Sequence, residues 1–285
     1  MIQSMTGYGK HILQLPSKKI TVEIKSLNSK NLDLNARVPG AYREKELLIR
    51  NRISKALLRG KVDFNLFVEI TGEATHTQVN ETIVNQYMQQ LKQVVDTDPT
   101  ELLKMAIRMP DALKTEREEV DEDEFSAILE AVDIALTAIN NYRSDEGKTL
   151  ESEFAQRVEN IAQLLDEVIA IDPQRIDNVK ERLRKAVSEL KETVDENRFE
   201  QELIYYLEKY DITEEKVRLK NHLDYFKEAL AQKDSNGKKL GFISQEIGRE
   251  INTIGSKANF APMQQLVVQM KDELEKIKEQ ALNVL

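Results

Sequence analysis

Two glutamates spaced four residues apart are the clearest candidates for chemistry in this sequence. Glu246 and Glu250 lie in the segment 237–262, where apolar residues recur at spacings of three and four, so both carboxylates emerge from one surface of a predicted helix. Such a pair could bind a divalent metal ion or serve as general acid and base. Arg249 lies beside them and could hold a phosphate. The alternative is a structural Glu–Arg pair, and the residue pattern leaves both interpretations open.

A small, polar and basic segment follows this predicted helix. Residues 255–259, of sequence GSKAN, are predicted to form a loop of the kind that lets backbone N–H groups approach a phosphate. The alternative is a tight connection to the next helix.

His222 is the histidine that lies in a regular helical pattern. It occurs in the run EEKVRLKNHLDYF, next to the apolar stripe of Leu219, Leu223 and Phe226 rather than on it. A single histidine in such a place is usually structural. The alternative is a metal ligand or a general acid near the glutamate pair.

Several familiar chemistries are excluded by what the sequence lacks. It contains no P-loop, no dinucleotide-binding glycine motif, no nucleophile elbow and no H-E-x-x-H zinc motif. The absence of Cys also excludes disulfides, thiolate metal sites and cysteine nucleophiles.

Composition favours a helix-rich soluble protein. The 285 residues are 32% charged and include only 10 Gly, 6 Pro and 6% aromatic residues, whereas an all-β sandwich needs many turns. No apolar run approaches the roughly 18 residues of a membrane span. We therefore expect a soluble, cytoplasmic protein.

Charge is distributed unevenly along the chain. Residues 1–70 contain 13 Lys and Arg against 6 Asp and Glu, a net of +7, and the remaining residues contain 28 against 44, a net of −16. Such asymmetry indicates an anionic partner for the basic part. The alternative is a basic surface that pairs with the acidic remainder of the protein.

The N-terminal region is predicted to be an α+β unit. Alternating apolar residues predict strands at 20–25, 32–38 and 62–70, and a period of four over 42–58 predicts a helix. The expected arrangement is an antiparallel sheet packed with that helix, within residues 1–75.

From residue 80 onward the apolar period is helical. We predict a helical middle region over 76–175, ending at a break at Asp172-Pro173, and a C-terminal helical domain over 176–285. The last helix is coiled-coil-like, and its partner lies either in the same chain or, as we slightly favour, in another subunit. The heptad seam consists of Met263, Val267, Met270, Leu274, Ile277, Ala281 and Val284.

Several sequence blocks resemble the YicC/YloC family of bacterial endoribonucleases. In chain order they read MTGYGK, VEIKSLNSKNLDLNARVPG, RGKVDF, RSDEGKTLESEF, EEKVRLKNHLDYF and GKKLGFISQEIGREINTIGSKAN. The resemblance implies an endonuclease that depends on a divalent metal ion, cuts single-stranded RNA and assembles as a ring-like homohexamer. It also implies that the basic N-terminal unit and the C-terminal helical unit together enclose the RNA.

The resemblance also maps family motifs onto positions of this chain. The matched residues are Arg143, Glu146 and Gly147 (R-x-x-E-G), His222, Glu246, Arg249, Glu250 and Asn252 (Q-E-x-x-R-E-x-N), and Gly255, Ser256 and Lys257 (G-S-K). Three positions depart from the family pattern: Ser29 where His is common, Gly248 where Asn is common, and Phe260 where an acid is common. If that histidine or acid takes part in cleavage elsewhere in the family, this chain must manage without it.

We expect metal-assisted hydrolysis of RNA. Glu246 and Glu250, with Glu146 as a third carboxylate, would hold Mn²⁺ or Mg²⁺, which prefer oxygen ligands. Arg249 and Lys257 would neutralise the scissile phosphate. The catalytic candidates are Glu246, Glu250, Arg249 and His222, and RNA contacts are expected from Lys30, Arg37, Lys61, Arg143, Asn252, Ser256 and Lys257.

Two other classes of function fit parts of the same pattern. A non-catalytic adaptor that delivers RNA to another nuclease would use the same basic unit and the same oligomer, with both glutamates structural. A helical scaffold would explain the C-terminal half but leaves the basic N-terminal unit unexplained.

Overall fold

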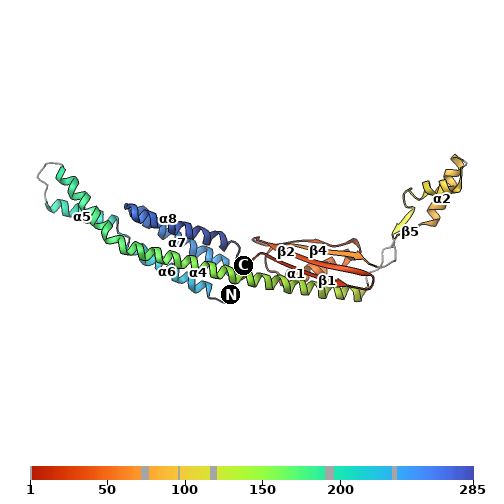
Figure 1. Ribbon diagram of the computed structural model, residues 1–285, viewed down its shortest axis with the longest axis horizontal. Helices are drawn as coiled ribbons and strands as arrows, with labels where there is room; N and C mark the ends of the chain where they lie inside the picture. The colour runs from red at the N-terminus through yellow and green to blue at the C-terminus, as the bar shows by residue number, and fades with distance from the viewer. Residues whose placement is uncertain (1, 72–76, 96, 116–120, 190–195, 233–235) are drawn as a thin grey trace.

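The computed structural model describes residues 2–71, 77–95, 97–115, 121–189, 196–232 and 236–285. The molecule is elongated: the helix α4 (Glu122–Glu189) runs along a four-stranded sheet and continues into a helical bundle (Figure 1). A small unit containing α2 (Glu81–Val94) lies beyond one end of the sheet, and α5 (Glu196–Lys209) lies at the opposite end of the molecule. The C-terminus lies near the middle, where sheet and bundle meet.

The sheet has the strand order β1-β2-β4-β3. Its strands are β1 (Gly7–Gln14), β2 (Lys18–Leu27), β3 (Leu32–Arg37) and β4 (Gly60–Ile70). The pairs β1–β2 and β2–β4 are antiparallel, whereas β3 and β4 are parallel because a 3-10 turn (Gly40–Lys45) and the helix α1 (Glu46–Ala56) connect them. The α+β class, the three predicted strands and the helix are confirmed, and the sheet is mixed rather than purely antiparallel.

Strand β1, which the sequence pattern did not predict, lies against α4. Its sequence GYGKHILQ contains two glycines near its start and lacks a clear apolar alternation. A Cβ atom at Gly9 would lie 2.1 Å from the backbone oxygen of Ala135 on α4. Glycine is therefore required where strand and helix approach most closely.

The core of the sheet unit forms on one face of the sheet. Alternate residues of β2 and β4, including Val22, Ile24 and Phe64, are fully buried against α1 and the first half of α4. The period-two pattern therefore identifies the buried face, as expected for a sheet covered on one side.

Helix α4 is 68 residues long and spans about 100 Å at 1.5 Å per residue. It continues through Pro173, so the predicted break at Asp172-Pro173 is wrong, and position 175 lies inside this helix. Contacts with α6 and with the residues before it hold the helical turn around Pro173. Asp172 accepts from Arg175 Nε and from Lys216 Nζ of α6, each at 2.7 Å. Arg175 in turn donates to the carbonyl of Tyr210 at 2.8 Å. Tertiary contacts on both sides of the proline override its tendency to end a helix.

The C-terminal bundle shares one core with the second half of α4. Its helices are α5 (Glu196–Lys209), α6 (Thr213–Leu230), α7 (Gly237–Lys257) and α8 (Ala261–Ala281). The heptad seam of α8 is buried inside the chain, at most 7% exposed, against α4 and α7. The slightly favoured prediction that the seam packs against another subunit is therefore wrong. Glycines on α7 let α8 approach closely: a Cβ at Gly248 would lie 3.1 Å from Leu274 Cδ2.

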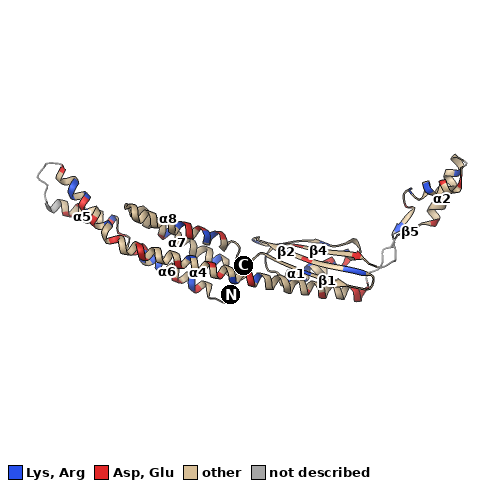
Figure 2. Cartoon of the chain, viewed as in Figure 1, with Lys and Arg blue, Asp and Glu red and all other residues tan. Residues whose placement is uncertain are grey.

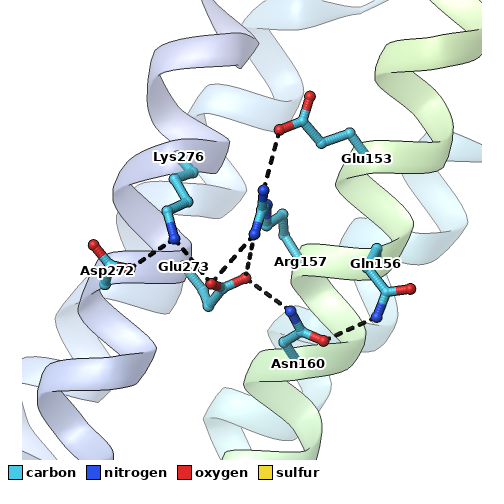
Figure 3. A network of polar contacts seen from close by, with 7 residues as sticks. All are labelled: Glu153, Gln156, Arg157, Asn160, Asp272, Glu273 and Lys276. Atoms are coloured by element: carbon cyan, nitrogen blue, oxygen red, sulfur yellow. Dashed lines mark hydrogen bonds and ion pairs between the residues drawn. The ribbon is translucent and has the colours of Figure 1, made fainter.

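A polar network on the surface fixes α8 against α4 (Figure 3). The carboxylate of Glu273 accepts from Asn160 Nδ2 at 2.9 Å, from Arg157 Nη1 at 3.2 Å and from Lys276 Nζ at 3.2 Å. Burial raises the pKa of Glu273, but these hydrogen bonds outweigh it and bring the pKa below its ordinary value.

The remaining elements form a small unit between the sheet and α4 in sequence. They are β5 (Thr77–Val79), α2 (Glu81–Val94), α3 (Pro99–Ala106) and β6 (Leu113–Thr115). Its core is small, with Val84, Ala106 and Ala112 buried. Across the described ranges, no helix combines the length and apolar character needed to cross a membrane.

Candidate functional site

Helix α7 carries most of the predicted site residues. Its N-cap is Asn236, whose side chain accepts from the backbone N–H of Lys239 at 3.1 Å. The helix continues to Lys257, so the predicted loop at 255–259 is wrong for its first three residues. Gly255 is helical because it faces α8, where a Cβ would lie 3.0 Å from Val267 Cγ1. Backbone N–H groups of this segment are therefore engaged in a helix rather than presented as a loop.

The two glutamates of α7 lie on one helix, as predicted, but in different surroundings. Glu246 is half-buried, and Arg249 Nη1 lies 3.3 Å from its Oε2. Glu250 is only 4% exposed. Its carboxylate makes no ion pair or side-chain hydrogen bond with any residue that the structure describes. Glu250 is therefore the glutamate of the pair that is not held by another described side chain.

The register between α6 and α7 places His222 level with Glu250. At one end of this antiparallel hairpin, Lys257 Nζ donates to Glu215 Oε1 at 2.7 Å and to the carbonyl of Asp211 at 2.9 Å. Glu250 precedes Lys257 by seven residues on α7, and His222 follows Glu215 by seven residues on α6. Seven residues are about two helical turns, so each lies two turns from the ion pair, on the side of its helix that faces the other helix. His222 is half-buried.

The same ion pair determines what Lys257 can do. Its ammonium is engaged by Glu215, which is itself only 6% exposed and whose other oxygen, Oε2, is buried without a partner among the described residues. Lys257 therefore fixes the hairpin rather than projecting toward solvent.

A different face of α7 carries the predicted RNA contacts. Gln245, Arg249, Asn252 and Ser256 are all exposed and follow one another at spacings of four, three and four. They form one polar stripe along the helix. This α7 stripe, as defined by those four residues, is the surface on which an extended strand could lie.

The R-x-x-E-G block of α4 binds the N-terminal segment of the same chain. Arg143, only 2% exposed, donates to Ser26 Oγ at 2.5 Å and to the carbonyl of Met5 at 3.2 Å, and burial lowers its pKa. Glu146 accepts from Thr6 Oγ1 at 2.5 Å. A Cβ at Gly147 would lie 2.0 Å from the carbonyl oxygen of Ile2. In this conformation Arg143 is inaccessible to RNA.

The three carboxylates predicted to share a metal ion do not come together in one chain. Glu246 and Glu250 lie on α7, whereas Glu146 faces the N-terminal segment on α4. Among the described residues, no group of three or more His, Cys, Asp or Glu side chains could hold a metal ion.

The basic residues of the N-terminal unit are only partly available to a ligand. Lys18, Lys45 and Arg52 form ion pairs with acidic residues in the first turns of α4, which is the intramolecular pairing that the charge distribution left open (Figure 2). The predicted contacts are exposed but separated: Lys61 lies at the start of β4, near Lys30, and Arg37 at the opposite end of β3.

Lys30 lines a cavity of about 540 Å³ between the sheet and the bundle, which we call the junction pocket. The sequence carries no signal for Lys278, whereas Arg59 and Lys238 stand in the RGKVDF and GKKLGF blocks but were not among the predicted RNA contacts. The pocket is lined by Met5, Asn28, Lys30, Arg59, Gly237, Lys238, Gly241, Gln245, Glu275, Lys278, Glu279, Ala281 and Leu282.

Together these features define a helix-rich α+β protein with a polar helical hairpin beside a basic pocket. Residues 2–152 match the family model described as endoribonuclease YicC-like, N-terminal region, and residues 168–285 match the model described as endoribonuclease YicC-like, C-terminal. The chain therefore belongs to the YicC-like endoribonuclease family.

Two relatives match over the whole of both chains. The chain is 35% identical to the probable endoribonuclease YicC of Clostridioides difficile (strain 630) and 30% identical to that of Haemophilus influenzae. The resemblance seen in the sequence blocks is confirmed.

Proposed function

We propose that this chain is an endoribonuclease acting on single-stranded RNA, with its active site on the α6–α7 hairpin. The observation that carries the proposal is the buried, unpaired Glu250 level with His222, beside the exposed α7 stripe. The names of the relatives support a nuclease, and RNA as its substrate.

In this proposal each residue of the hairpin has a different role in cleavage. Glu250 would hold the imidazole of His222 in one orientation, and His222 would move a proton to or from an oxygen at the scissile phosphate. Arg249, exposed on the α7 stripe, would neutralise the charge on that phosphate. Lys257 would act as a positioning residue, because its ion pair with Glu215 fixes the register of the hairpin.

A divalent ion is the second part of the proposal. Mg²⁺ is usually bound by one or two carboxylates together with substrate phosphates and water, and the pair Glu246 and Glu250 fits that mode. Glu146 lies on a different helix, α4, where it accepts a hydrogen bond from Thr6, and it forms no three-ligand group with them among the described residues. When bound, Mn²⁺ or Mg²⁺ would supply Lewis-acid stabilisation of the charge at the phosphate.

The decisive experiment compares Glu250→Gln with the wild type on a labelled single-stranded RNA, with Mn²⁺, with Mg²⁺ and with EDTA. We expect the rate to fall by about a hundredfold or more, because the change removes the group that orients the general acid–base His222, and such catalysis typically contributes that much. The RNA affinity should stay within about twofold, since Glu250 is buried and the change preserves its shape. Glu228→Gln, at an exposed glutamate of α6, is the matched control.

Two results would contradict this site. Wild-type cleavage by Glu250→Gln would place the chemistry elsewhere, and cleavage that persists in EDTA would remove the divalent ion from the proposal. RNA binding without cleavage under every metal condition would instead support the adaptor, a function favoured by the absence of a three-ligand metal cluster in the described part of one chain.

The proposed assembly is a homo-oligomer, with the hexamer implied by the family resemblance, located in the cytoplasm. The heptad seam of α8 is not its contact surface, because that seam is buried within the chain. Native mass spectrometry would measure the stoichiometry directly, and a monomer at micromolar concentration would contradict the assembly.

A further inference from the structure

The junction pocket has the position of a binding site built by two units of the chain. The sheet unit contributes the segment after β2 and the residue before β4, and the bundle contributes the first turns of α7 and the last turns of α8. Its volume of about 540 Å³ lies within the range of roughly 300–1,000 Å³ usual for small-ligand sites.

The pocket carries more positive than negative charge, in a chain whose net charge is −9. Four cationic side chains line it, against the two carboxylates of Glu275 and Glu279. Lys278 approaches Glu275 at 3.7 Å, whereas Lys30 and Lys238 form no ion pair with any described residue. The unpaired cations favour an anionic ligand.

Arg59 is held rigidly at the wall of this pocket. Its Nη2 donates to the carbonyl of Val284 at 3.0 Å, and its Nε and Nη2 lie 3.3 and 3.2 Å from the sulfur of Met5. Its Nη1 makes no hydrogen bond within the described residues. A fixed guanidinium with a free donor suits a phosphate oxygen, because less side-chain freedom is lost on binding.

Apolar and amide groups complete the wall. Leu282, which is 66% exposed, supplies the apolar surface, whereas Met5 is only 2% exposed and lies behind Arg59. Asn28 is fixed by donating to the carbonyl of Leu282 at 2.7 Å, and the exposed amide of Gln245 is free to donate and accept. These groups match the needs of a nucleobase, which has an apolar face and a polar edge.

We propose that the junction pocket binds one nucleotide of an RNA strand, with its phosphate on Lys30, Lys238 and Arg59 and its base against Leu282. Gln245 belongs both to the pocket and to the α7 stripe. A strand anchored in the pocket therefore continues along α7 for about 16 Å to Ser256, past Arg249. This inference rests on the proposed function for its substrate class and adds where that substrate is anchored.

The test measures RNA affinity against salt for full-length protein carrying Glu250→Gln, which separates binding from cleavage. The probe is a 12-nucleotide, single-stranded, fluorescently labelled RNA containing one 4-thiouridine. Adding Lys30→Ala and Lys238→Ala together should weaken binding roughly tenfold at 0.15 M salt. It should also reduce the slope of log affinity against log salt by about 0.7, since the two lysines hold one phosphate and each neutralised single-strand phosphate contributes about 0.7.

The matched control is Lys220→Ala with Lys271→Ala, two exposed lysines of the bundle that remove the same charge away from the pocket. It should change neither affinity nor slope. Ultraviolet crosslinking of the thiouridine followed by peptide mapping should identify peptides containing Leu282.

The outcomes separate this inference from the proposed function. If the pocket variant and the control have equal affinity and slope, or if crosslinks map elsewhere, the pocket assignment is overturned even when the wild type cuts RNA. Binding and crosslinking in the pocket by a wild type that never cuts would support the pocket and overturn the nuclease. Absence of RNA binding in every protein would overturn both.

Discussion

Glu250 and Arg143 are both buried charged residues, but they differ in the hydrogen bonds that their side chains make. The guanidinium of Arg143 donates to two acceptors from the N-terminal segment and β2, whereas the carboxylate of Glu250 has no described partner. The bonds of its Nη2 commit Arg143 to this junction, although its Nε is buried without a partner, whereas no described side chain holds Glu250. Both residues match motifs of the family, and the motifs do not distinguish them, because burial and hydrogen bonding depend on neighbours that are distant in sequence.

Arg143→Met tests this distinction at the residue scale. The change leaves the carbonyl of Met5 and the hydroxyl of Ser26 without their charged donor, so we expect a loss of about 2–3 kcal/mol in the free energy of unfolding. Urea unfolding measures it, with Arg184→Met, at an exposed arginine of the same helix, as control. RNA affinity well below the unfolding temperature should be unchanged; a large loss of affinity with unaltered stability would support the predicted RNA contact instead.

At the scale of elements, long-range packing decides what local patterns leave open. The alternation of apolar residues identified β2, β3 and β4, because each presents alternate side chains to one core. It did not predict β1, because the glycines of this strand are required by a close contact with α4, more than 120 residues away in sequence. It also predicted that a helix ends at Pro173, whereas contacts with α6 hold the helix together there. The heptad seam was visible, but only the fold shows that α4 and α7 cover it.

Gly9→Ala probes the contact between β1 and α4. Its Cβ would meet the Ala135 backbone oxygen at 2.1 Å, so strand or helix must shift, and we expect a loss of about 2 kcal/mol or more in unfolding free energy. Gly40→Ala, where nothing lies within 4 Å of the new Cβ, should stay within about 0.5 kcal/mol of the wild type. Equal stability of the two variants would mean that β1 does not lie against α4 as described.

The Glu273 network makes the contact between α4 and α8 dependent on pH. Because the folded-state pKa of Glu273 lies below its ordinary value of 4.5, its stabilising effect is present above that value and is lost as the pH falls through the lowered folded pKa. Glu273→Gln should therefore be less stable than the wild type at pH 7, and the difference should narrow below about pH 4.5. Thermal unfolding from pH 3 to 7 measures this, with Glu279→Gln as the exposed control on the same helix; a constant difference would contradict it.

On the scale of the whole molecule, the two ends of the chain assemble the junction. The backbone N–H of Met5 donates to Asn283 at 2.8 Å, that of Leu285 donates to Gln3 at 2.9 Å, and Val284 is fully buried. The sequence predicted a basic N-terminal unit and a polar C-terminal helix that act together. It could not predict that the pocket between them depends on the last residues, since no local pattern records a contact across 280 positions.

Deletion of residues 283–285 therefore tests whether the junction serves RNA binding. It removes the Val284 carbonyl that holds Arg59 and the backbone bonds to the N-terminal segment. We expect the KM for RNA to rise about tenfold with kcat nearly unchanged, because the pocket anchors substrate and the hairpin performs the chemistry. Asn283→Ala is the control, since it preserves the backbone bonds and removes side-chain contacts with Gln280 and, at 3.5 Å, with Asn28, which still donates to the Leu282 carbonyl. A fall in kcat at constant KM would instead couple the junction to the chemistry of the hairpin, and the division of roles between pocket and helix would be wrong.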